Sequence, residues 1–387
     1  MLFNAIDRGD HTMPRVSSFS NTFGREVYMT IESYAGEDIA YVLKDLFSTY
    51  SSCMRQNSIS EDSEVFIRIH LSDIAEQETV VRKFLEDRGA ASFYSLVGQQ
   101  PASGNKAAIE VYHIASEKRI TKENPSGDML LVSHGGYRSF WSRSIPLTTG
   151  PAGMQTAEIY NDLSGKLKRF DATIKDNVMR TWIYMRDIDN NYHEFSRARN
   201  SYFSSLGMTK DTHTIASTGI EGLSSERRQT VIMDSLSILG INGNQIEFMS
   251  APDHMCPTYQ YNVTFERGTK ITFADRTHYH ISGTASIDRV GNVLYPGDIE
   301  RQALRILENM NALLSSYGSG LHEMKMLRVY IRNSSDFARI RVFLIQNLPE
   351  GLPFLIVRGA VCRPAWLIEM DGIAVSSAGD NSFEPFC

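Results

Sequence analysis

The chain lacks several features that would assign it to a class at once. None of its apolar runs approaches the roughly 18–20 residues that a membrane-spanning helix needs. Its four cysteines are far apart and show no CxxC spacing, so they outline neither a disulfide scaffold nor a zinc site. No GxxxxGK[ST] or GxGxxG phosphate loop occurs. These absences favour a globular protein of a reducing compartment, and a cytoplasmic location is expected.

An excess of positive charge is also missing. The chain has 39 Lys and Arg against 45 Asp and Glu, which gives a formal net charge of -6. Nucleic-acid-binding domains usually carry a basic face, so no nucleic-acid partner is expected. The N-terminal segment MLFNAIDRGDHTMPRVSS lacks the apolar centre of a signal peptide, and no membrane partner is expected. With 387 residues and no Gly/Ser-rich linker, the chain is expected to form two or three tightly packed domains.

One pattern of elements recurs along the chain. The C-terminal part reads as helix, strand, helix and two strands, and the N-terminal part has the same order. The strings IEVYHIA and IEMDGIA are nearly identical, and they set Glu110 and Glu369 259 positions apart. Asp38 and Asp298, which each precede a predicted helix, are 260 positions apart. These offsets indicate a duplicated module.

A third, more divergent copy lies in the middle, where Met233 takes the place of Glu369. A predicted hairpin precedes the first helix of each outer copy. The sequence therefore predicts an α+β fold of three tandem modules, 1–150, 151–245 and 246–387, each a sheet with helices on one face. The open sheet faces need partners, and packing them together would form a single-chain pseudo-trimer.

Glu369 stands in CRPAWLIEMDGIA, an otherwise apolar run that predicts a buried strand. Carboxylates are rarely buried without a partner or a role. One interpretation pairs Glu369 with an arginine such as Arg332 or Arg363, which would join two modules. The other places it in a functional pocket.

Two further motifs bear on a binding site. Gly283 and Thr284, in SGTAS, are expected at a strand end or bulge, where glycine lets a ligand approach the backbone. His278 and His280 fall on the same side of a strand, but no third residue has the spacing of a metal ligand. Packing or hydrogen bonding is therefore preferred for this pair, and no metal site is predicted.

The module resembles the YjgF/RidA superfamily, whose members are typically homotrimers with ligand sites between subunits. In that family the last strand carries a functional glutamate in an IE-x-x-x-IA context, which Glu369 matches. Within the superfamily, four stretches are similar to the chorismatases, which fuse such modules into one chain: RTWIYMRDIDNNYHEFSRARNSYF (180–203), CPTYQYNVTFERG (256–268), YHISGTASI (279–287) and VCRPAWLIEMDGIA (361–374).

The resemblance implies cleavage of the enolpyruvyl ether of chorismate, with release of pyruvate and a hydroxybenzoate-type product. Glu369 would be the general acid, its pKa raised by apolar neighbours. Cys362 would lie in the same pocket, at a position that influences which product forms. Neither a metal nor an organic cofactor is implied. The expected ligands of the substrate's carboxylates and hydroxyls are arginines and tyrosines: Arg267, Arg332, Arg186, Arg363, Tyr259, Tyr279 and Tyr184.

Two alternatives remain open at this level. The chain could be a YjgF/RidA-type protein that binds a small carboxylate without turnover, or an imine or enamine deaminase. The second is disfavoured, because residues 354–356 are apolar where such deaminases carry a carboxylate-binding arginine. In each case the expected partner is a small anionic metabolite, and the expected assembly is a monomer or weak homo-oligomer.

Overall fold

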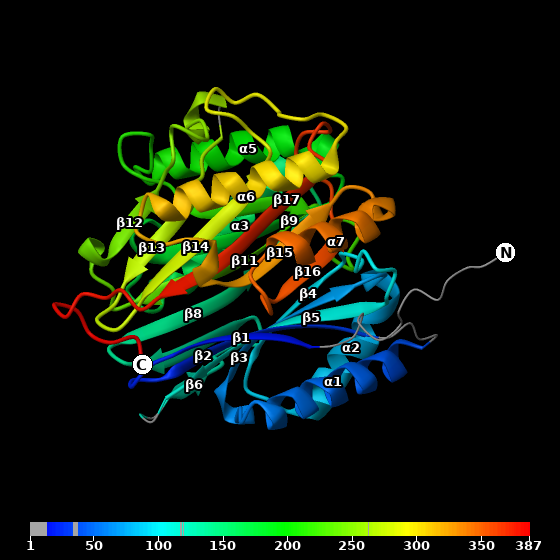
Figure 1. The fold of residues 1–387 in the computed structure, drawn as a ribbon, viewed down its shortest axis with the longest axis vertical. Coiled ribbons are helices and arrows are strands. Elements are labelled where there is room, and N and C mark those ends of the chain that lie inside the picture. Colours follow the sequence, from blue (N-terminus) through cyan, green and yellow to red (C-terminus); the bar gives the residue numbers. More distant parts are fainter. Residues whose placement is uncertain (1–13, 34–37, 117, 119, 262) are drawn as a thin grey trace.

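The computed structural model describes residues 14–33, 38–116, 118, 120–261 and 263–387 (Figure 1). The segment judged for a signal peptide lies largely outside these ranges. No helix within them is both long and apolar enough to cross a membrane. Figure 1 shows three sheets in the middle of the molecule with helices on the outside.

The first module is a five-stranded sheet of order β1-β2-β5-β3-β4. Two helices, α1 and α2, cover its outer face (Figure 1). The elements are β1 (Arg15–Ser20), β2 (Arg25–Glu32), α1 (Ile39–Gln56), β3 (Glu64–Leu71), α2 (Ile74–Arg88), β4 (Phe93–Val97) and β5 (Ala107–Ala115).

The second module has six strands in the order β10-β9-β11-β8-β7-β6. Its main helices are α3 and α5. The elements are β6 (Thr121–Glu123), β7 (Met129–His134), β8 (Tyr137–Ser144), α3 (Ala152–Lys168), α4 (Ile174–Asn177), β9 (Val178–Met185), α5 (Ile188–Ser205), β10 (Ala216–Glu221) and β11 (Val231–Leu239).

The third module repeats this plan with the order β12-β13-β14-β17-β15-β16. The elements are β12 (Ile246–Met249), β13 (Gly268–Thr272), β14 (Thr277–Ala285), α6 (Ile299–Ser315), β15 (Met324–Ile331), α7 (Phe337–Asn347), β16 (Phe354–Arg358) and β17 (Ile368–Ser376). Three sheets of the same strand order confirm the predicted α+β fold of three tandem modules.

The boundary predicted at 150/151 does not coincide with the division between sheets. Strand β8 pairs with β11 along Met233–Leu239, and β7 pairs with β8, so the second sheet begins near residue 121. The prediction missed this hairpin because it began the middle copy at its helix, after HGGY (134–137). That segment is the turn between β7 and β8, with Gly135 at φ +52°.

Equivalent helices begin for the same local reason. The Asp38 carboxylate accepts a hydrogen bond from the backbone N–H of Ala40, and Asp298 accepts one from Arg301. Such caps satisfy N–H groups that a first helical turn leaves unpaired, and each is worth about 1 kcal/mol. Apolar side chains at helical spacing then bury one face of α6: Ile299, Ala303, Ile306, Met310 and Leu313.

Backbone hydrogen bonds join the modules into a closed ring. The Gly98 N–H donates to the Leu223 carbonyl (2.9 Å), which links the first module to the second. The Glu221 N–H donates to Ala360 (3.0 Å), and the Arg358 N–H donates to Gln100 (2.8 Å). Each module therefore touches both others, as subunits of a trimer do.

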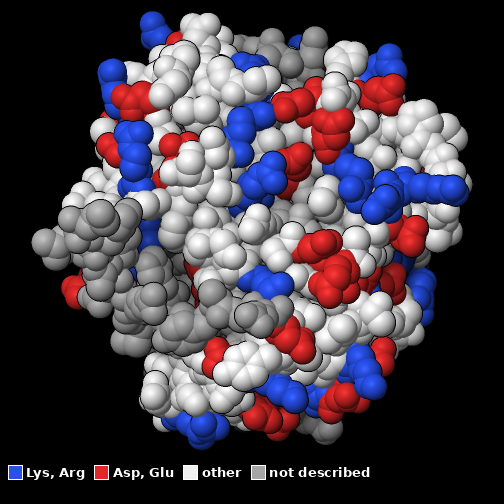
Figure 2. Space-filling view, turned by 90° about the vertical axis from the view of Figure 1, so that its right-hand side faces the viewer, with Lys and Arg blue, Asp and Glu red and all other residues white. Residues whose placement is uncertain are grey.

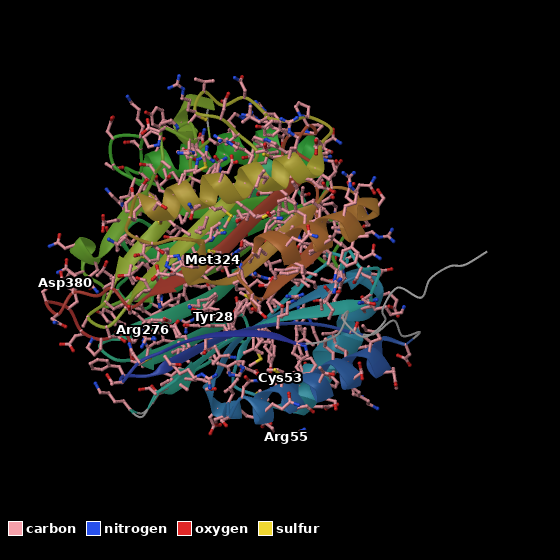
Figure 3. All side chains as sticks on the ribbon, viewed as in Figure 1. Tyr28, Cys53, Arg55, Arg276, Met324 and Asp380 are labelled. Atoms are coloured by element: carbon pink, nitrogen blue, oxygen red, sulfur yellow. The ribbon has the colours of Figure 1, made fainter. Side chains whose placement is uncertain are left out.

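The surface and the interior differ as expected for such an assembly. Figure 2 shows charges of both signs interspersed over one face, with no broad basic patch on that face. Figure 3 places Tyr28, Arg276 and Met324 where the sheets face one another, and all three are buried. It places Arg55 at the outer end of α1. The sheets thus bury polar as well as apolar groups between them.

An ionic ring lies where the three open faces meet. Arg68 of the first module contacts Asp234 of the second (3.3 Å). Arg180 of the second contacts Asp371 of the third (3.2 Å), and Arg328 of the third contacts Glu110 of the first (2.5 Å). All six side chains are buried. Each module therefore gives one arginine to the acid of the next.

Strand register corrects the internal alignment predicted from the sequence. Glu110 lies opposite Arg68 on β3, and Asp371 lies opposite the equivalent Arg328 on β15, so Glu110 corresponds to Asp371 and not to Glu369. Glu369 faces Tyr330, and the matching positions in the other sheets are Ala108 and Ile232 rather than Glu110 and Met233. The nearly identical strings misled because one is shifted by two residues in register.

Candidate active site

A small chamber surrounds Glu369 between the second and third modules. Its volume is about 40 Å³. Helix α5 and strand β10 supply one wall, and β14, β17 and the segments before β13 and β17 supply the other. The lining residues are Tyr192, Arg199, Ser217, Gly219, Phe265, Arg267, Gly283, Ala285, Ile287, Cys362, Trp366 and Glu369. The prediction that Glu369, Cys362, Arg267 and Gly283 lie close together agrees with this geometry.

Glu369 differs from the other buried acids. Glu26, Glu64, Glu110, Asp234 and Asp371 are buried, and each forms an ion pair with an arginine. Glu369 is 6% exposed, and no ion pair or hydrogen bond joins it to another of the described residues. The interpretation that pairs it with Arg332 or Arg363 is therefore wrong for this structure.

Its surroundings keep this carboxyl protonated. Burial and the nearby Asp371 carboxylate raise the pKa of Glu369 to about 8, although Arg267 and Arg180 act in the opposite direction. Burial penalises the charged form, and a second negative charge penalises it further. At neutral pH the group can therefore donate a proton, as a general acid must.

A bulge in β14 makes room for the Glu369 side chain. The register between β14 and β17 shifts between Ile281 and Thr284. A Cβ on Gly283 would lie 2.3 Å from Glu369 Oε1, so any larger residue here would force the carboxyl to move. Thr284, predicted to bind the ligand, does not line the chamber, and its hydroxyl donates to the Ser282 carbonyl (2.9 Å). The bulge was predicted correctly, whereas the role of Thr284 was not.

Cys362 faces the chamber as a neutral thiol. Burial and the neighbouring Glu369 raise the pKa of Cys362 to about 12, although a hydrogen bond with the Tyr192 side chain acts in the opposite direction. A thiol with such a pKa is a poor nucleophile near neutral pH, because the thiolate is the reactive form. Its contribution at this position is therefore shape and a weak S–H donor.

Arg267 stands between the chamber and a wider hollow of about 380 Å³. Phe265 and Arg267 line both spaces. One guanidinium nitrogen of Arg267 donates to the Cys256 carbonyl (2.8 Å), which fixes the side chain. Tyr259 lines the hollow from the short 3-10 helix Thr258–Tyr261 and is exposed. The predicted Tyr259 thus lies outside the chamber but beside its entrance.

A second cation comes from the other module. Arg199 of α5 is buried, and its Nε and one Nη have no hydrogen-bond partner in the part of the chain that the structure describes. Its guanidinium lies over the Phe195 ring at 4.8 Å. Buried donors of this kind favour a bound acceptor, and a carboxylate matches the guanidinium best.

The remaining predicted ligands lie elsewhere. Arg332 pairs with Asp189 (2.8 and 3.0 Å) and so fastens β15 to the start of α5. Arg186 donates to the Ser224 carbonyl (2.8 Å), and Arg363 donates to Gly291 (3.0 Å) while lying over the Trp366 ring. None of these three lines the chamber. Their backbone and interface roles could not be distinguished from ligand binding without the fold.

Two further predicted tyrosines, on strands of different sheets, also lie outside the chamber. Tyr279 is buried in the core of the third module, 3.4 Å from the Tyr317 carbonyl. Tyr184 is buried beside the ionic ring, 5.6 Å from the guanidinium of Arg68 to the ring centre. Neither side chain lines the chamber.

Several lining residues were missed by the sequence analysis. Tyr192 and Arg199 are separated by seven residues, two turns of α5, so they share one helix face. Both lie in the 180–203 stretch, and that spacing was the signal available. Ser217, Gly219, Phe265 and Trp366 carry no comparable signal, because small and aromatic residues are common in any interface.

The histidine pair has another explanation. His278 Nε2 lies 2.9 Å from Glu26 Oε1. His280 faces a different cavity, on the axis of the molecule. Within the described ranges, no group of three or more His, Cys, Asp or Glu residues gathers as metal ligands would.

Comparisons with known proteins agree with this architecture. The family described as Endoribonuclease L-PSP matches residues 271–376. A RutC family protein of Pyrococcus abyssi is 30% identical over 95 residues, which cover 24% of this chain and 75% of the relative. A 3-hydroxybenzoate synthase of Streptomyces hygroscopicus is 24% identical over 281 residues, covering 65% of this chain and 78% of the relative.

A solved structure extends the likeness over nearly the whole chain. A crystal structure of a chorismatase superposes with a TM-score of 0.65 at 16% identity, covering 92% of this chain and 100% of that chain. At this level of identity the likeness establishes a common fold. All three modules are therefore part of the shared architecture.

Proposed function

Because the chain belongs to the YjgF/RidA superfamily, we propose that it is a chorismatase-like enzyme that cleaves the enolpyruvyl ether of chorismate. The products are pyruvate and a hydroxybenzoate-type compound. The similarity to a 3-hydroxybenzoate synthase and the chorismatase fold support this substrate class. The observation that carries the proposal is Glu369, a buried carboxyl without an ion pair whose pKa is raised to about 8.

Glu369 is the general acid of the proposed reaction. When the methylene carbon of an enol ether takes up a proton, the ether carbon becomes electron-deficient. Addition of water at that carbon gives a hemiketal that breaks down to pyruvate and a ring diol, and loss of water from the diol gives the hydroxybenzoate-type product. Glu369 donates that proton, and its carboxylate then faces the positive charge that develops on the substrate. Glu369 is 6% exposed, which limits contact of its carboxyl with solvent and keeps the proton for the substrate.

The shape of the site suggests how the substrate lies. A chamber of about 40 Å³ holds only a small group, whereas ligand sites for whole metabolites usually measure roughly 300–1,000 Å³. The hollow of about 380 Å³ beside it supplies that space. We therefore place the enolpyruvyl group next to Glu369 and the ring toward the hollow.

Two arginines complement the two carboxylates of chorismate. Arg267 stands at the boundary between chamber and hollow, and Arg199 reaches the chamber from the second module. Guanidinium groups bind carboxylates through paired hydrogen bonds. A dianion is thereby held across the module interface, which orients its ether toward Glu369.

The proposed role of Cys362 is to shape the product-forming step. Its neutral thiol lines the chamber close enough to Glu369 for the acid's charge to affect the thiol pKa. A small, weakly polar wall leaves the ring carbons accessible without adding a strong base. Cys362→Ala is expected to change the ratio of products more than the rate of pyruvate release.

Incubation with chorismate tests the proposal directly. Pyruvate should accumulate, and Glu369→Gln should lower its rate by at least about 10²-fold, because the amide keeps the shape but cannot donate the proton. Glu247→Gln changes an exposed acid of the same module and serves as the control. The rate of the unmodified protein should fall as pH rises through about 8. Absence of pyruvate above background would contradict the proposal.

A second candidate is a small-carboxylate-binding protein or an imine or enamine deaminase. A 3-aminoacrylate deaminase of Acinetobacter baylyi is 28% identical over 104 residues, covering 27% of this chain and 82% of the relative. A thermal-shift screen of small carboxylates separates the candidates. Stabilisation by chorismate without pyruvate release would favour binding alone, whereas ammonia release from an imine would favour the deaminase.

A further inference from the structure

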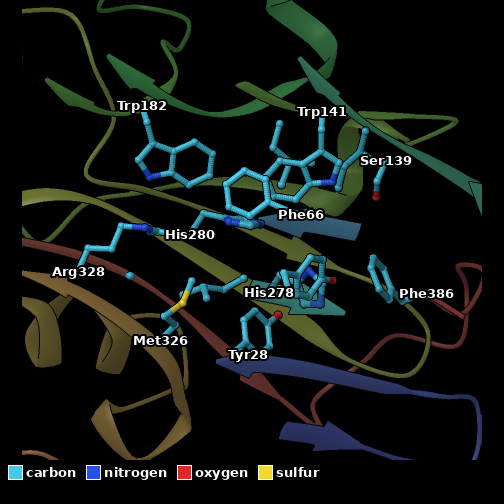
Figure 4. Close-up of a pocket in the computed structure, with 15 residues that line it drawn as sticks. Tyr28, Phe66, Ser139, Trp141, Trp182, His278, His280, Met326, Arg328 and Phe386 are labelled. Carbon is cyan, nitrogen blue, oxygen red and sulfur yellow. The ribbon is translucent and has the colours of Figure 1, made fainter. Parts of the chain in front are cut away.

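A second cavity lies where the open faces of all three sheets meet, apart from the Glu369 chamber. We refer to it as the axial cavity, and its volume is about 40 Å³ (Figure 4). Fifteen residues line it, from the first module (Tyr28, Phe66, Tyr112), the second (Ser139, Trp141, Trp182, Leu236, Ile238) and the third (His278, His280, Met326, Arg328, Gly372, Ile373, Phe386). It shares no residue with the Glu369 chamber.

Hydrogen-bond donors line this cavity without partners. The indole Nε1 atoms of Trp141 and Trp182 and the Nε2 of His280 make no hydrogen bond within the described ranges. The three residues are 6%, 4% and 5% exposed. Figure 4 shows these side chains around the cavity, with Arg328 reaching toward Trp182. Buried donors are nearly always satisfied, so two unpartnered indole N–H groups in one cavity, beside a histidine nitrogen that also lacks a partner, indicate an occupant.

The same lining offers few acceptors. No Asp or Glu lines the axial cavity. The hydroxyls of Tyr28 and Tyr112 donate to Glu26, at 2.9 and 2.6 Å, and the Ser139 hydroxyl is engaged with His134 (2.6 Å). Burial lowers the pKa of His280, so this ring is neutral and one of its nitrogens is an acceptor, but water molecules would have to place two protons each. An anion only accepts hydrogen bonds.

The charges near Arg328, at one end of the cavity, also favour an anion. The ionic ring beside the cavity contains the acids Glu110, Asp234 and Asp371. Four buried arginines contact those acids, which leaves one positive charge in excess: Arg68, Arg143, Arg180 and Arg328. A buried charge excess of this kind is costly unless a counter-ion is present.

The opposite end carries an excess of negative charge, because the carboxylates of Glu26 and Asp275 share one arginine, Arg276. Glu26 accepts hydrogen bonds from Arg276 (2.7 Å) and from both tyrosines, and His278 lies 2.9 Å away. Arg276 also pairs with Asp275 (2.6 Å). An anion is therefore expected at the Arg328 end of the cavity, away from Glu26.

We propose that the axial cavity binds one small monoanion, a halide or an ion of the size of formate. The indole N–H of Trp182 and the Arg328 guanidinium, which lie at the same end of the cavity, hold it (Figure 4). A free volume of about 40 Å³ corresponds to about three water positions, which suits a single ion of this size and excludes a larger metabolite. This site is independent of the proposed reaction at Glu369.

Crystals grown in sodium bromide test the location. Bromide should give an anomalous difference peak in the axial cavity, within hydrogen-bonding reach of Trp182 and of Arg328. Crystals grown in sodium formate should show the planar ion at the same place. A cavity that contains only waters in both crystals, or bromide only on the surface, would overturn the proposal.

Thermal unfolding of the full chain tests the binding. At equal ionic strength, Tm should rise with bromide concentration and saturate, relative to sodium gluconate, whose anion is too large for the cavity. Trp182→Phe removes the donor beside Arg328 and should reduce the bromide-dependent rise by at least half. Trp366→Phe is the matched control, because its indole donates to the Ser286 carbonyl (3.0 Å) outside this cavity. Equal Tm in both salts, or an equal loss in both variants, would contradict the proposal.

Discussion

Two carboxyl groups on one strand have opposite ionisation states. Glu369 and Asp371 are two residues apart on β17 and so point to the same side of the sheet. Asp371 is held ionised by Arg328 and Arg180, which lower its pKa although burial acts against them. Its fixed charge then helps to keep Glu369 protonated. Together with burial, the charge of the paired Asp371 thus raises the pKa of the unpaired Glu369.

The pH dependence of folding stability should reflect the raised pKa of Glu369. The pKa of Glu369 is about 8 in the folded state against an ordinary value of 4.5, so between these pH values the folded state holds a proton that the unfolded state has lost. Folding stability therefore falls as pH rises through this window. Relative to the unmodified protein, Glu369→Gln should gain stability on the order of 4 kcal/mol between pH 5 and pH 9.

Urea denaturation at pH 5, 7 and 9 measures that difference. The Glu247→Gln control should follow the unmodified protein at all three values, since Glu247 is an exposed residue paired with Lys270. A gap between Glu369→Gln and the unmodified protein that stays constant with pH would show that Glu369 titrates normally.

For single residues, the sequence predicted that Glu369 is an unusual buried acid, but not whether an arginine neutralises it. A carboxyl inside CRPAWLIEMDGIA is recognisably exceptional, and Cys362, seven residues earlier, could be expected in the same pocket. The position of Gly283 beside it depends on the pairing of β14 with β17. Whether an arginine neutralises it depends on where Arg332 and Arg363 point. That information resides in tertiary contacts with Asp189 and Gly291, which no local pattern encodes.

At the scale of the element, the bulge in β14 decides whether the acid has room. Ser282 and Gly283 together lie opposite the single residue Asp371, and this one extra residue bends the strand and leaves a position without a side chain against Glu369. Bulges of this kind redirect side chains near functional sites. Gly283 therefore makes room for the Glu369 side chain in the chamber, in addition to shaping the strand.

Gly283→Ala tests the importance of that space. The added Cβ would lie 2.3 Å from Glu369 Oε1 and 3.0 Å from its Cδ, so the carboxyl must move. Pyruvate release should fall by at least about tenfold, because small displacements of a proton donor are costly to rate. Circular dichroism should show that the fold persists.

Gly219→Ala is the matched control for this substitution. Gly219 lines the same chamber, but its added Cβ would meet Tyr192 Cε2 at 3.7 Å, an ordinary contact. A moderate effect on KM is expected, with kcat largely kept. Equal losses of kcat in the two variants would show that crowding of the chamber, and not displacement of Glu369, limits the reaction.

Elements were predicted better than their register. The helices capped by Asp38 and Asp298 and the strands between them follow from periodicity and caps. Register does not, because side chains repeat every two residues along a strand, and a shift of two leaves the apolar pattern unchanged. The alignment of Glu110 with Glu369 failed for that reason, and only pairing with Arg68 and Arg328 identifies the true counterpart.

At the scale of the whole molecule, the ionic ring makes the three modules interdependent. Each arginine reaches the acid of the next module, and Trp182 lies against Arg68, Arg180 and Arg328 at 4.8, 4.8 and 5.1 Å. Removing one partner of a buried ion pair leaves an uncompensated charge. A substitution that removes one of these ion pairs should therefore destabilise all three modules.

Arg328→Met should destabilise the protein by about 3–5 kcal/mol, since Glu110 and Asp371 both lose a partner. Arg332→Met is the control, because its pair with Asp189 is partly exposed and should be worth about 1 kcal/mol or less. Chemical denaturation followed by tryptophan fluorescence and by circular dichroism gives both values. The two probes should show one coincident transition, whereas separate transitions would mean that the modules unfold independently.

The register of β5, β11 and β17 also determines how many substrate molecules one chain can bind. A trimer of identical modules would present the same acid three times, and ligand binding at one interface could alter the other two. Here the positions equivalent to Glu369 are Ala108 and Ile232, so the other two interfaces lack the acid. One chain should accordingly be saturated by one equivalent of substrate, along a hyperbolic curve. The other two interfaces are free to evolve for rigidity alone.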